Sequence, residues 1–159
     1  MLFRSAPRLS SSVTVVLGHE AEKAEALLAG RRVNIVRNPD YAQGMSTSLA
    51  AGLKALPPDA EAVVVLLADM PRVNAAHVDR LIAAFDAGNP SIVVPMQGGR
   101  RGNPILWPRE FFAGMQAVSG DQGARGLLAA NAARIVGVNL DDAIHADIDT
   151  PDDLRRAQP

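Results

Sequence analysis

The stretch Ala62-Val63-Val64-Val65-Leu66-Leu67-Ala68-Asp69-Met70-Pro71 decides the fold of this 159-residue chain. Its seven consecutive apolar residues predict a strand that is covered on both faces, as in a parallel sheet. An acidic residue follows the strand directly. Because ligands bind outside the carboxyl ends of strands in open α/β sheets, Asp69 lies where a functional side chain is expected.

Strands and helices alternate on both sides of this stretch. Further strands are predicted at 13–17, 33–36, 91–95, 105–107, 135–138 and 144–148, from short apolar and β-branched runs. Helices are predicted at 20–29, 46–56, 74–85, 109–118 and 123–131, and from 150 onward, from apolar residues at helical spacing and from caps. The alternation predicts an α/β fold with a mainly parallel sheet and helices on both faces, in one domain over residues 13–159.

The start of the chain departs from this pattern. A doubly wound nucleotide-binding domain opens with a buried strand and a glycine-rich turn, and residues 1–12 are polar and match neither. We expect a disordered or irregular start over 1–12 and a sheet that lacks its first strand. The two strands beside the empty position would then have unpaired backbone groups.

Composition narrows the class of protein. The net charge is −1, from 16 basic and 17 acidic residues, so no overall field favours nucleic acid or an anionic membrane as partner. Cysteine is absent, which excludes disulfides and thiolate metal sites. No apolar run approaches the roughly 20 residues of a membrane span, and the start has no secretory signal pattern. We expect a cytoplasmic protein.

Several polar groups stand at predicted strand ends or helix starts. Asp69 and Asp149 could together hold Mg²⁺, which takes one or two carboxylates, waters and substrate phosphate oxygens; the plain alternative for each is a helix cap. The Gly44-Met45-Ser46-Thr47-Ser48 run suits an anion or a nucleotide edge at a helix start. Arg100 and Arg101 suit phosphate, although most such arginines are only solvated. His19, His77 and His145 lack a partner at metal-ligand spacing and are interpreted as structural or solvent-facing.

Five motifs occur in order along the chain. They are Asn38-Pro39-Asp40-Tyr41-Ala42-Gln43-Gly44-Met45-Ser46-Thr47-Ser48-Leu49, Leu67-Ala68-Asp69-Met70-Pro71, Arg101-Gly102-Asn103-Pro104, Gly120-Asp121-Gln122-Gly123-Ala124-Arg125 and Asp147-Ile148-Asp149-Thr150-Pro151-Asp152-Asp153-Leu154. Together they resemble the molybdopterin cytidylyltransferases of the MobA-like nucleotidyltransferase superfamily, over about residues 13 to 157.

The resemblance implies a Rossmann-like nucleotidyltransferase fold and transfer of CMP from Mg-CTP to molybdopterin or the molybdenum cofactor, with release of pyrophosphate. It implies that Asp69 and Asp149 bind the metal and that Gly44, Met45, Ser46, Thr47 and Ser48 lie along the base and ribose. It places Arg101, Gly102, Asn103, Pro104, Asp121, Gly123 and Arg125 on the pterin side. A recipient molybdoenzyme or its chaperone is an implied partner.

The same resemblance implies a glycine-rich triphosphate loop after the first strand, and no segment of this sequence matches it. We therefore expect CTP turnover by the chain as written to be impaired.

Three other interpretations stay open. The first is guanylyl transfer, or transfer to another small phosphorylated acceptor, within the same superfamily. The second is a non-catalytic module that binds or delivers the cofactor. The third is a signalling receiver domain, which also has a buried strand ending in Asp, but here no acidic pair follows the strand at 13–17.

Overall fold

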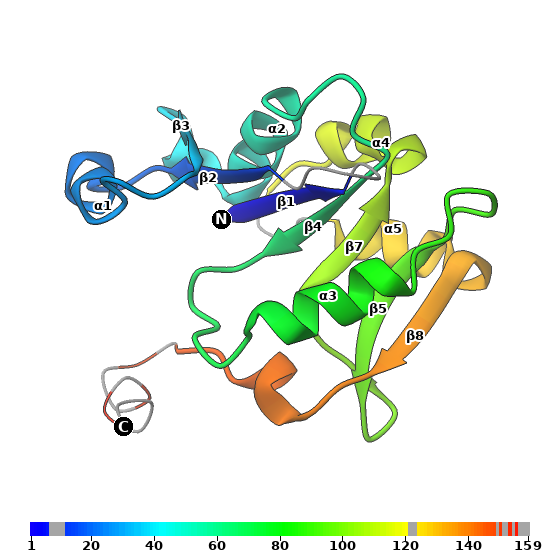
Figure 1. Ribbon diagram of the computed structural model, residues 1–159. Coiled ribbons are helices and arrows are strands. Elements are labelled where there is room, and N and C mark those ends of the chain that lie inside the picture. The colour runs from blue at the N-terminus through cyan, green and yellow to red at the C-terminus, as the bar shows by residue number, and fades with distance from the viewer. Residues whose placement is uncertain (7–11, 121–123, 149, 151–152, 154, 156–159) are drawn as a thin grey trace.

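The computed structural model describes residues 1–6, 12–120, 124–148, 150, 153 and 155. One eight-stranded sheet runs in the order β3-β2-β1-β4-β7-β5-β6, and β8 pairs with β5 (Figure 1). The strands are β1 Leu2–Ala6, β2 Val13–Leu17, β3 Asn34–Arg37, β4 Ala62–Leu66, β5 Ile92–Gln97, β6 Arg100–Arg101, β7 Ile105–Pro108 and β8 Ile135–Asn139. The helices are α1 Ala21–Leu27, α2 Met45–Lys54, α3 Ala75–Ala83, α4 Phe112–Ala117 and α5 Arg125–Ala130. Short 3-10 turns lie at η1 Tyr41–Gln43, η2 Arg109–Phe111, η3 Ala132–Arg134 and η4 Asp142–His145.

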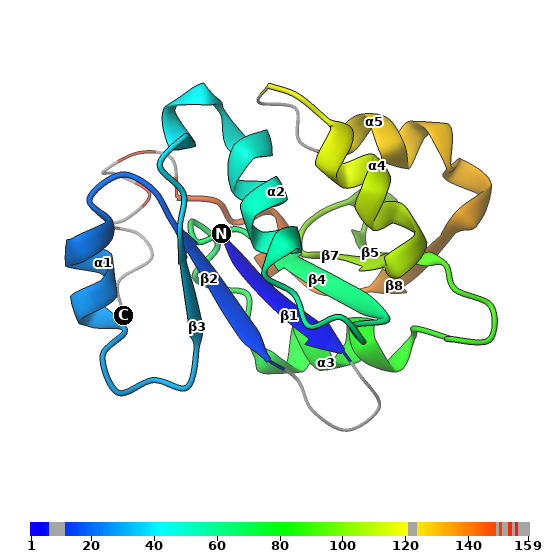
Figure 2. The same cartoon turned by 90° about the horizontal axis from the view of Figure 1, so that it is seen from above.

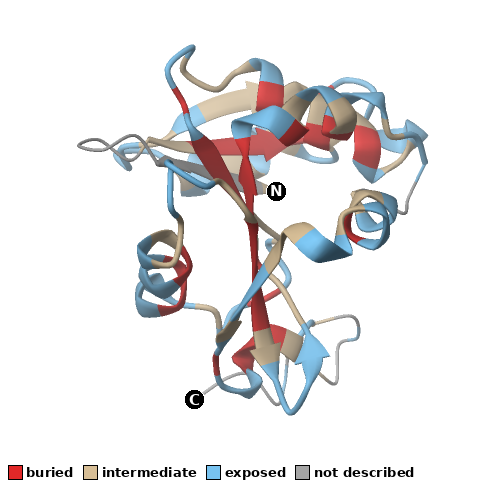
Figure 3. Ribbon diagram, turned by 90° about the vertical axis from the view of Figure 1, so that its right-hand side faces the viewer, coloured by how far each residue is buried: buried red, intermediate tan, exposed pale blue. Residues whose placement is uncertain are grey.

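Helices cover both faces of the sheet, as the sequence predicts. Helices α2, α4 and α5 lie above it and α3 lies below it in Figure 2. Alternate residues of β4 point to opposite faces, so Val63 packs in the core under α2 and α4 while Val64 packs in the core against α3. The buried residues concentrate along the central strands (Figure 3). Because its side chains alternate between the two faces, β4 contributes to both apolar cores.

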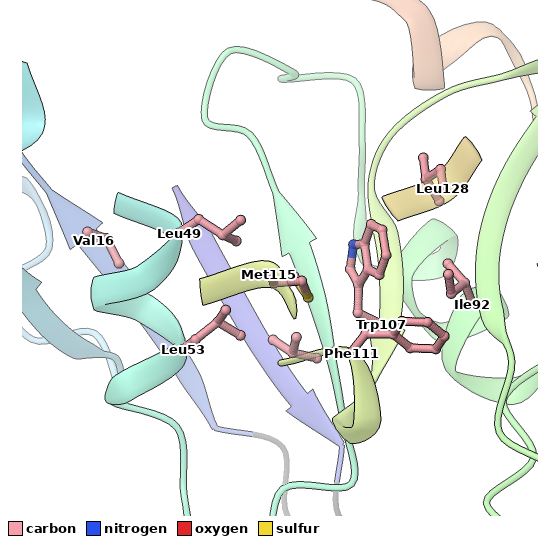
Figure 4. Close-up of a cluster of buried hydrophobic side chains, with 9 residues drawn as sticks. Val16, Leu49, Leu53, Ile92, Trp107, Phe111, Met115 and Leu128 are labelled. Carbon is pink, nitrogen blue, oxygen red and sulfur yellow. The ribbon is translucent and has the colours of Figure 1, made fainter. Parts of the chain in front are cut away.

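The larger core brings segments that are distant in sequence together. Figure 4 shows Leu49 and Leu53 of α2, Met115 of α4 and Leu128 of α5 on one side of the sheet, with Trp107 between them. Trp107 is buried and its ring meets Phe111 edge-on, with centroids 6.1 Å apart. Such aromatic pairs add about 0.5–1.5 kcal/mol beyond the burial of their area.

The start of the chain differs from the expectation. Residues 2–6 form β1, which lies between β2 and β4 and pairs antiparallel with both, from Leu2↔Leu66 to Ala6↔Ala62 on the β4 side. The expectation of an irregular start is therefore wrong for these residues, and residues 7–11 lie outside the described residues. The physical reason is pairing: the facing backbone groups of β2 and β4 need partners, and any extended segment supplies them.

The sheet is also mixed rather than mainly parallel. Strands β2 and β3 pair in parallel, as do β5 and β8, but β1 and β7 run against both of their neighbours. The expected strand at 144–148 is likewise absent. Residues 142–145 form η4 instead, because Asp141 caps that turn by accepting from the backbone N–H of Ala143. Among the residues that the structure describes, none of the helices has the length and apolarity that a bilayer crossing requires.

Candidate active site

Asp69 is an exposed carboxylate in the turn after β4, three residues beyond Leu66, so the strand is shorter than the run that predicted it. The plain alternative, that it caps the next helix, does not hold. The cap of α3 is Asn74, whose side chain accepts from the backbone N–H groups of Ala76 and His77 at 3.0 and 3.4 Å. Asp69 therefore does not cap α3.

The end of the chain returns to Asp69. The backbone N–H of Ile148 donates to the carbonyl oxygen of Asp69 across 2.8 Å. This bond brings the Asp-Ile-Asp motif to the strand end that carries Asp69. Asp149 itself lies outside the described residues, and the cap bonds that follow it come from Thr150, which exchanges hydrogen bonds with Asp153.

A cavity of about 140 Å³ lies beside this strand end. Three of the sequence motifs each contribute one lining residue: Met45 of α2, Asn103 and Arg125. Most of the other lining residues are apolar, and they include Leu67 of the chain segment that leads to Asp69. Four residues labelled in Figure 4 also line it: Leu49, Trp107, Met115 and Leu128. A small apolar cleft with a few convergent polar groups has the character of a small-molecule site.

The run from Gly44 to Ser48 forms the start of α2, and a buried side chain organises it. Asn38 donates to the hydroxyl oxygens of Thr47 and Ser48 at 2.9 and 3.0 Å. The Thr47 hydroxyl lies 3.0 Å from the Asp40 carbonyl oxygen and 2.9 Å from that of Gly44. Nothing local in the sequence indicates that an asparagine at a strand end is buried, so the role of Asn38 emerges only from the structure.

The same helix start contacts the next predicted segment. The backbone N–H of Ser46 donates to the carbonyl oxygen of Gly120 at 3.3 Å. Asp121 and Gly123 lie outside the described residues, but Arg125, at the first position of α5, is exposed and lines the cavity.

The loop from Arg101 to Pro104 packs against the returning chain. Asn103 donates its backbone N–H to the Ile144 carbonyl oxygen at 3.2 Å. A Cβ on Gly102 would lie 2.5 Å from that same oxygen, so this contact requires glycine. Arg101 is exposed and Pro104 is buried.

Near Asp69 the described residues hold no ready-made metal site. Among the described residues, no three His, Cys, Asp or Glu side chains gather into a metal-binding group. A cation here would therefore depend on one or two carboxylates and on substrate oxygens, which is how Mg²⁺ is commonly held at phosphate sites. Met1 also lines the cavity. Burial lowers the pKa of its amino group, and attraction to Asp69 partly opposes that shift.

Comparison with known proteins identifies the family. A family model for the MobA-like NTP transferase domain matches residues 1–135. The chain belongs to this family. MobA-like transferases are nucleotidyltransferases, so the chain is assigned to that enzyme class and the receiver-domain interpretation is excluded. The match includes the first twelve residues, which the sequence had set apart.

This MobA-like transferase is similar to individual proteins in sequence and in structure. It is 28% identical to molybdenum cofactor cytidylyltransferase of Escherichia coli (strain K12) over 157 residues, which cover 98% of this chain and 78% of that protein. It is 32% identical to the purine catabolism protein PucB of Bacillus subtilis (strain 168) over 124 residues, 74% of this chain and 59% of that one. The structure of Rv0371c from Mycobacterium tuberculosis H37Rv in complex with manganese matches with a TM-score of 0.77 and 26% identity, over 90% of this chain and 75% of that one.

Proposed function

We propose that this MobA-like transferase moves a cytidylyl group from CTP to the terminal phosphate of molybdopterin or of its molybdenum form. A phosphate oxygen of the acceptor bonds to the α-phosphorus of CTP, and the bond from that phosphorus to the bridging oxygen breaks. Pyrophosphate leaves with the electron pair. The cytidylyltransferase of E. coli supports this substrate pair by its similarity over nearly the whole chain. A recipient molybdoenzyme or its chaperone is part of the same proposal.

The observation that carries the proposal is the bond of 2.8 Å between the Ile148 N–H and the Asp69 carbonyl oxygen. It joins the two segments whose carboxylates the proposal needs, next to a cavity lined by Met45, Asn103 and Arg125. Asp69 and Asp149 would hold Mg²⁺. The bound ion would neutralise charge on the phosphates, as it does at many phosphoryl-transfer sites. The manganese complex of Rv0371c supports a divalent cation.

The residues of the chain would act mainly by position and charge. The helix start from Gly44 to Ser48 would lie along the base and ribose of the nucleotide, with Met45 lining the cavity. Arg101 and Arg125 would bind the acceptor phosphate and the pterin side together with Gly102, Asn103, Pro104, Asp121 and Gly123. The acceptor phosphate is already a nucleophile, so no side chain has to remove a proton from it, and orientation supplies much of the rate.

The test is magnesium-dependent pyrophosphate release from CTP with molybdopterin, in the parent and in Asp69→Asn. We expect slow turnover in the parent itself, because no segment matches the glycine-rich triphosphate loop. We expect Asp69→Asn to lose at least about 100-fold in rate, the scale on which one preorganised electrostatic contact acts. The matched control is Asp59→Asn, an exposed aspartate before the opposite end of β4, which should retain the parent rate. Full activity of Asp69→Asn would overturn the metal assignment.

The same assay separates the alternatives. Faster turnover with GTP than with CTP would replace the proposal by guanylyl transfer. Binding of molybdopterin without pyrophosphate release would support a module that carries the cofactor.

A further inference from the structure

After β8 the chain returns toward Asp69, and side chains from residues 72–80 bind this part of it. We define the return segment as residues 139–148. Three backbone hydrogen bonds join it to the sheet and loops. The N–H of Leu140 donates to the Met96 carbonyl oxygen at 2.8 Å, and the Ile144 carbonyl oxygen accepts from the N–H of Asn103 at 3.2 Å. The N–H of Ile148 donates to the Asp69 carbonyl oxygen at 2.8 Å. The segment therefore contacts both the substrate loop and the strand end with Asp69.

Three side chains from residues 72–80 bind this segment. Arg72 makes two parallel bonds to Asp142, Nη1 to Oδ2 at 3.1 Å and Nη2 to Oδ1 at 2.9 Å. Arg80 donates to the Asn139 carbonyl oxygen at 2.6 Å. A bidentate arginine–carboxylate pair restricts orientation as well as distance. The Arg72–Asp142 pair thus ties the loop that follows Asp69 to the segment that leads to Asp147.

The third side chain, His77, is buried, and its hydrogen bonds define its tautomer. The backbone N–H of Asn74 donates to Nδ1 at 3.1 Å, so Nδ1 carries no proton and the ring proton is on Nε2. Nε2–H then donates to Asp141 Oδ2 at 3.2 Å. The other oxygen of Asp141 caps η4 through Ala143. One imidazole therefore connects the start of α3 to the start of η4.

We propose that Arg72, His77 and their partners Asp142 and Asp141 form a positioning clamp, which fixes where Asp147 and Ile148 lie relative to Asp69. The inference rests on the proposed function. The clamp residues are positioning residues: they act on a bound divalent cation through the segment they hold. Arg72 and Asp142 are mostly exposed, and isolated exposed pairs add little stability. Their effect should appear in cation affinity and not in the melting temperature.

The experiment measures binding of Mn²⁺ alone to the full chain, by electron paramagnetic resonance of the free ion. The variants are Arg72→Ala, Asp142→Ala and the swapped pair Arg72→Asp with Asp142→Arg. Loss of a group that orients a metal ligand lowers affinity by about 10-fold or more. We expect both single variants to bind Mn²⁺ about 10-fold more weakly and the swapped pair to recover most of the affinity.

The directions of the two changes in Mn²⁺ affinity distinguish a positioning effect from a simple charge effect. If only long-range electrostatics mattered, removing the cationic Arg72 would strengthen cation binding and removing the anionic Asp142 would weaken it. The clamp predicts weakening in both. The matched control is the exposed Arg134–Glu110 pair, where Arg134→Ala and Glu110→Ala should leave Mn²⁺ binding unchanged. Opposite signs for Arg72→Ala and Asp142→Ala, or parental affinity in both, would overturn the clamp.

Asp69→Asn separates this failure from failure of the proposed function. If Asp69→Asn loses Mn²⁺ while both clamp variants bind normally, the clamp is wrong and the metal assignment stands. If Asp69→Asn binds Mn²⁺ like the parent, the metal assignment and the clamp fail together.

Discussion

At the residue scale, the site depends on polar side chains whose partners are far away in sequence. Asn38 holds the hydroxyls of Thr47 and Ser48, and His77 holds Asp141 across 64 positions. Burial of such groups is tolerated because each has its hydrogen bonds, whereas a buried group without them costs about 1–3 kcal/mol. These residues shape the site without being exposed in it.

Asp141 gives a pH dependence at this scale. Its pKa lies below the ordinary value of 3.8, because the Ala143 N–H and then the His77 side chain donate to the carboxylate. A depressed pKa in the folded state contributes stability above the unfolded value, and that contribution is lost as the pH falls through the folded value. We expect Asp141→Asn to be less stable than the parent at pH 7 and the difference to shrink below pH 3.8.

Urea unfolding at pH 7 and at acid pH checks this expectation. Asp59→Asn serves as the control, because Asp59 is exposed before β4. A stability difference between Asp141→Asn and the parent that stays constant with pH would contradict the assigned cause.

At the element scale, α3 both covers one face of the sheet and carries the residues that bind the return segment. Its inner side buries Val78 and Leu81 against the second core, while His77 faces Asp141 at its start. Packing and positioning are therefore carried by one helix of nine residues. Its capping box, formed by Asn74 and His77, defines where it begins.

Truncation of Leu81 tests the packing role of α3. Leu81 is fully buried, and removal of a buried leucine side chain to alanine costs about 2–5 kcal/mol. We expect Leu81→Ala to lower the free energy of unfolding by this amount in urea denaturation. Leu27→Ala in α1 is the control, because that leucine is 81% exposed. Equal losses in the two variants would argue against α3 as a structural support.

At the scale of the whole molecule, β1 connects the two halves of the sheet. It is the strand between β2 and β4, and it is antiparallel to both. Because every residue inside such a strand has neighbours on both sides, its backbone groups complete two ladders at once. Without it, β2 and β3 would lose their hydrogen-bonded connection to the rest of the sheet.

A proline in β1 tests this connection. Arg4 is paired with Val13 on one side and with Val64 on the other. Proline removes a backbone donor and is excluded from central strands, so Arg4→Pro should lower the melting temperature clearly. Arg4→Ala, which keeps the backbone donor, is the control. An unchanged melting temperature of Arg4→Pro would show that β1 does not hold the sheet together.

The sequence by itself determined most of the helices and strands and the order of the motifs, but not β1 or η4. A continuous β-branched run predicted β2 at its observed bounds, and α3 begins after the cap at Asn74 as expected, because both signals are local. Local signals could not predict that residues 2–6 pair between two strands, since that choice depends on backbone groups of β2 and β4 that need partners. They also could not bring Ile148 to Asp69 or His77 to Asp141. Those contacts join distant parts of the chain, so only the tertiary structure decided them.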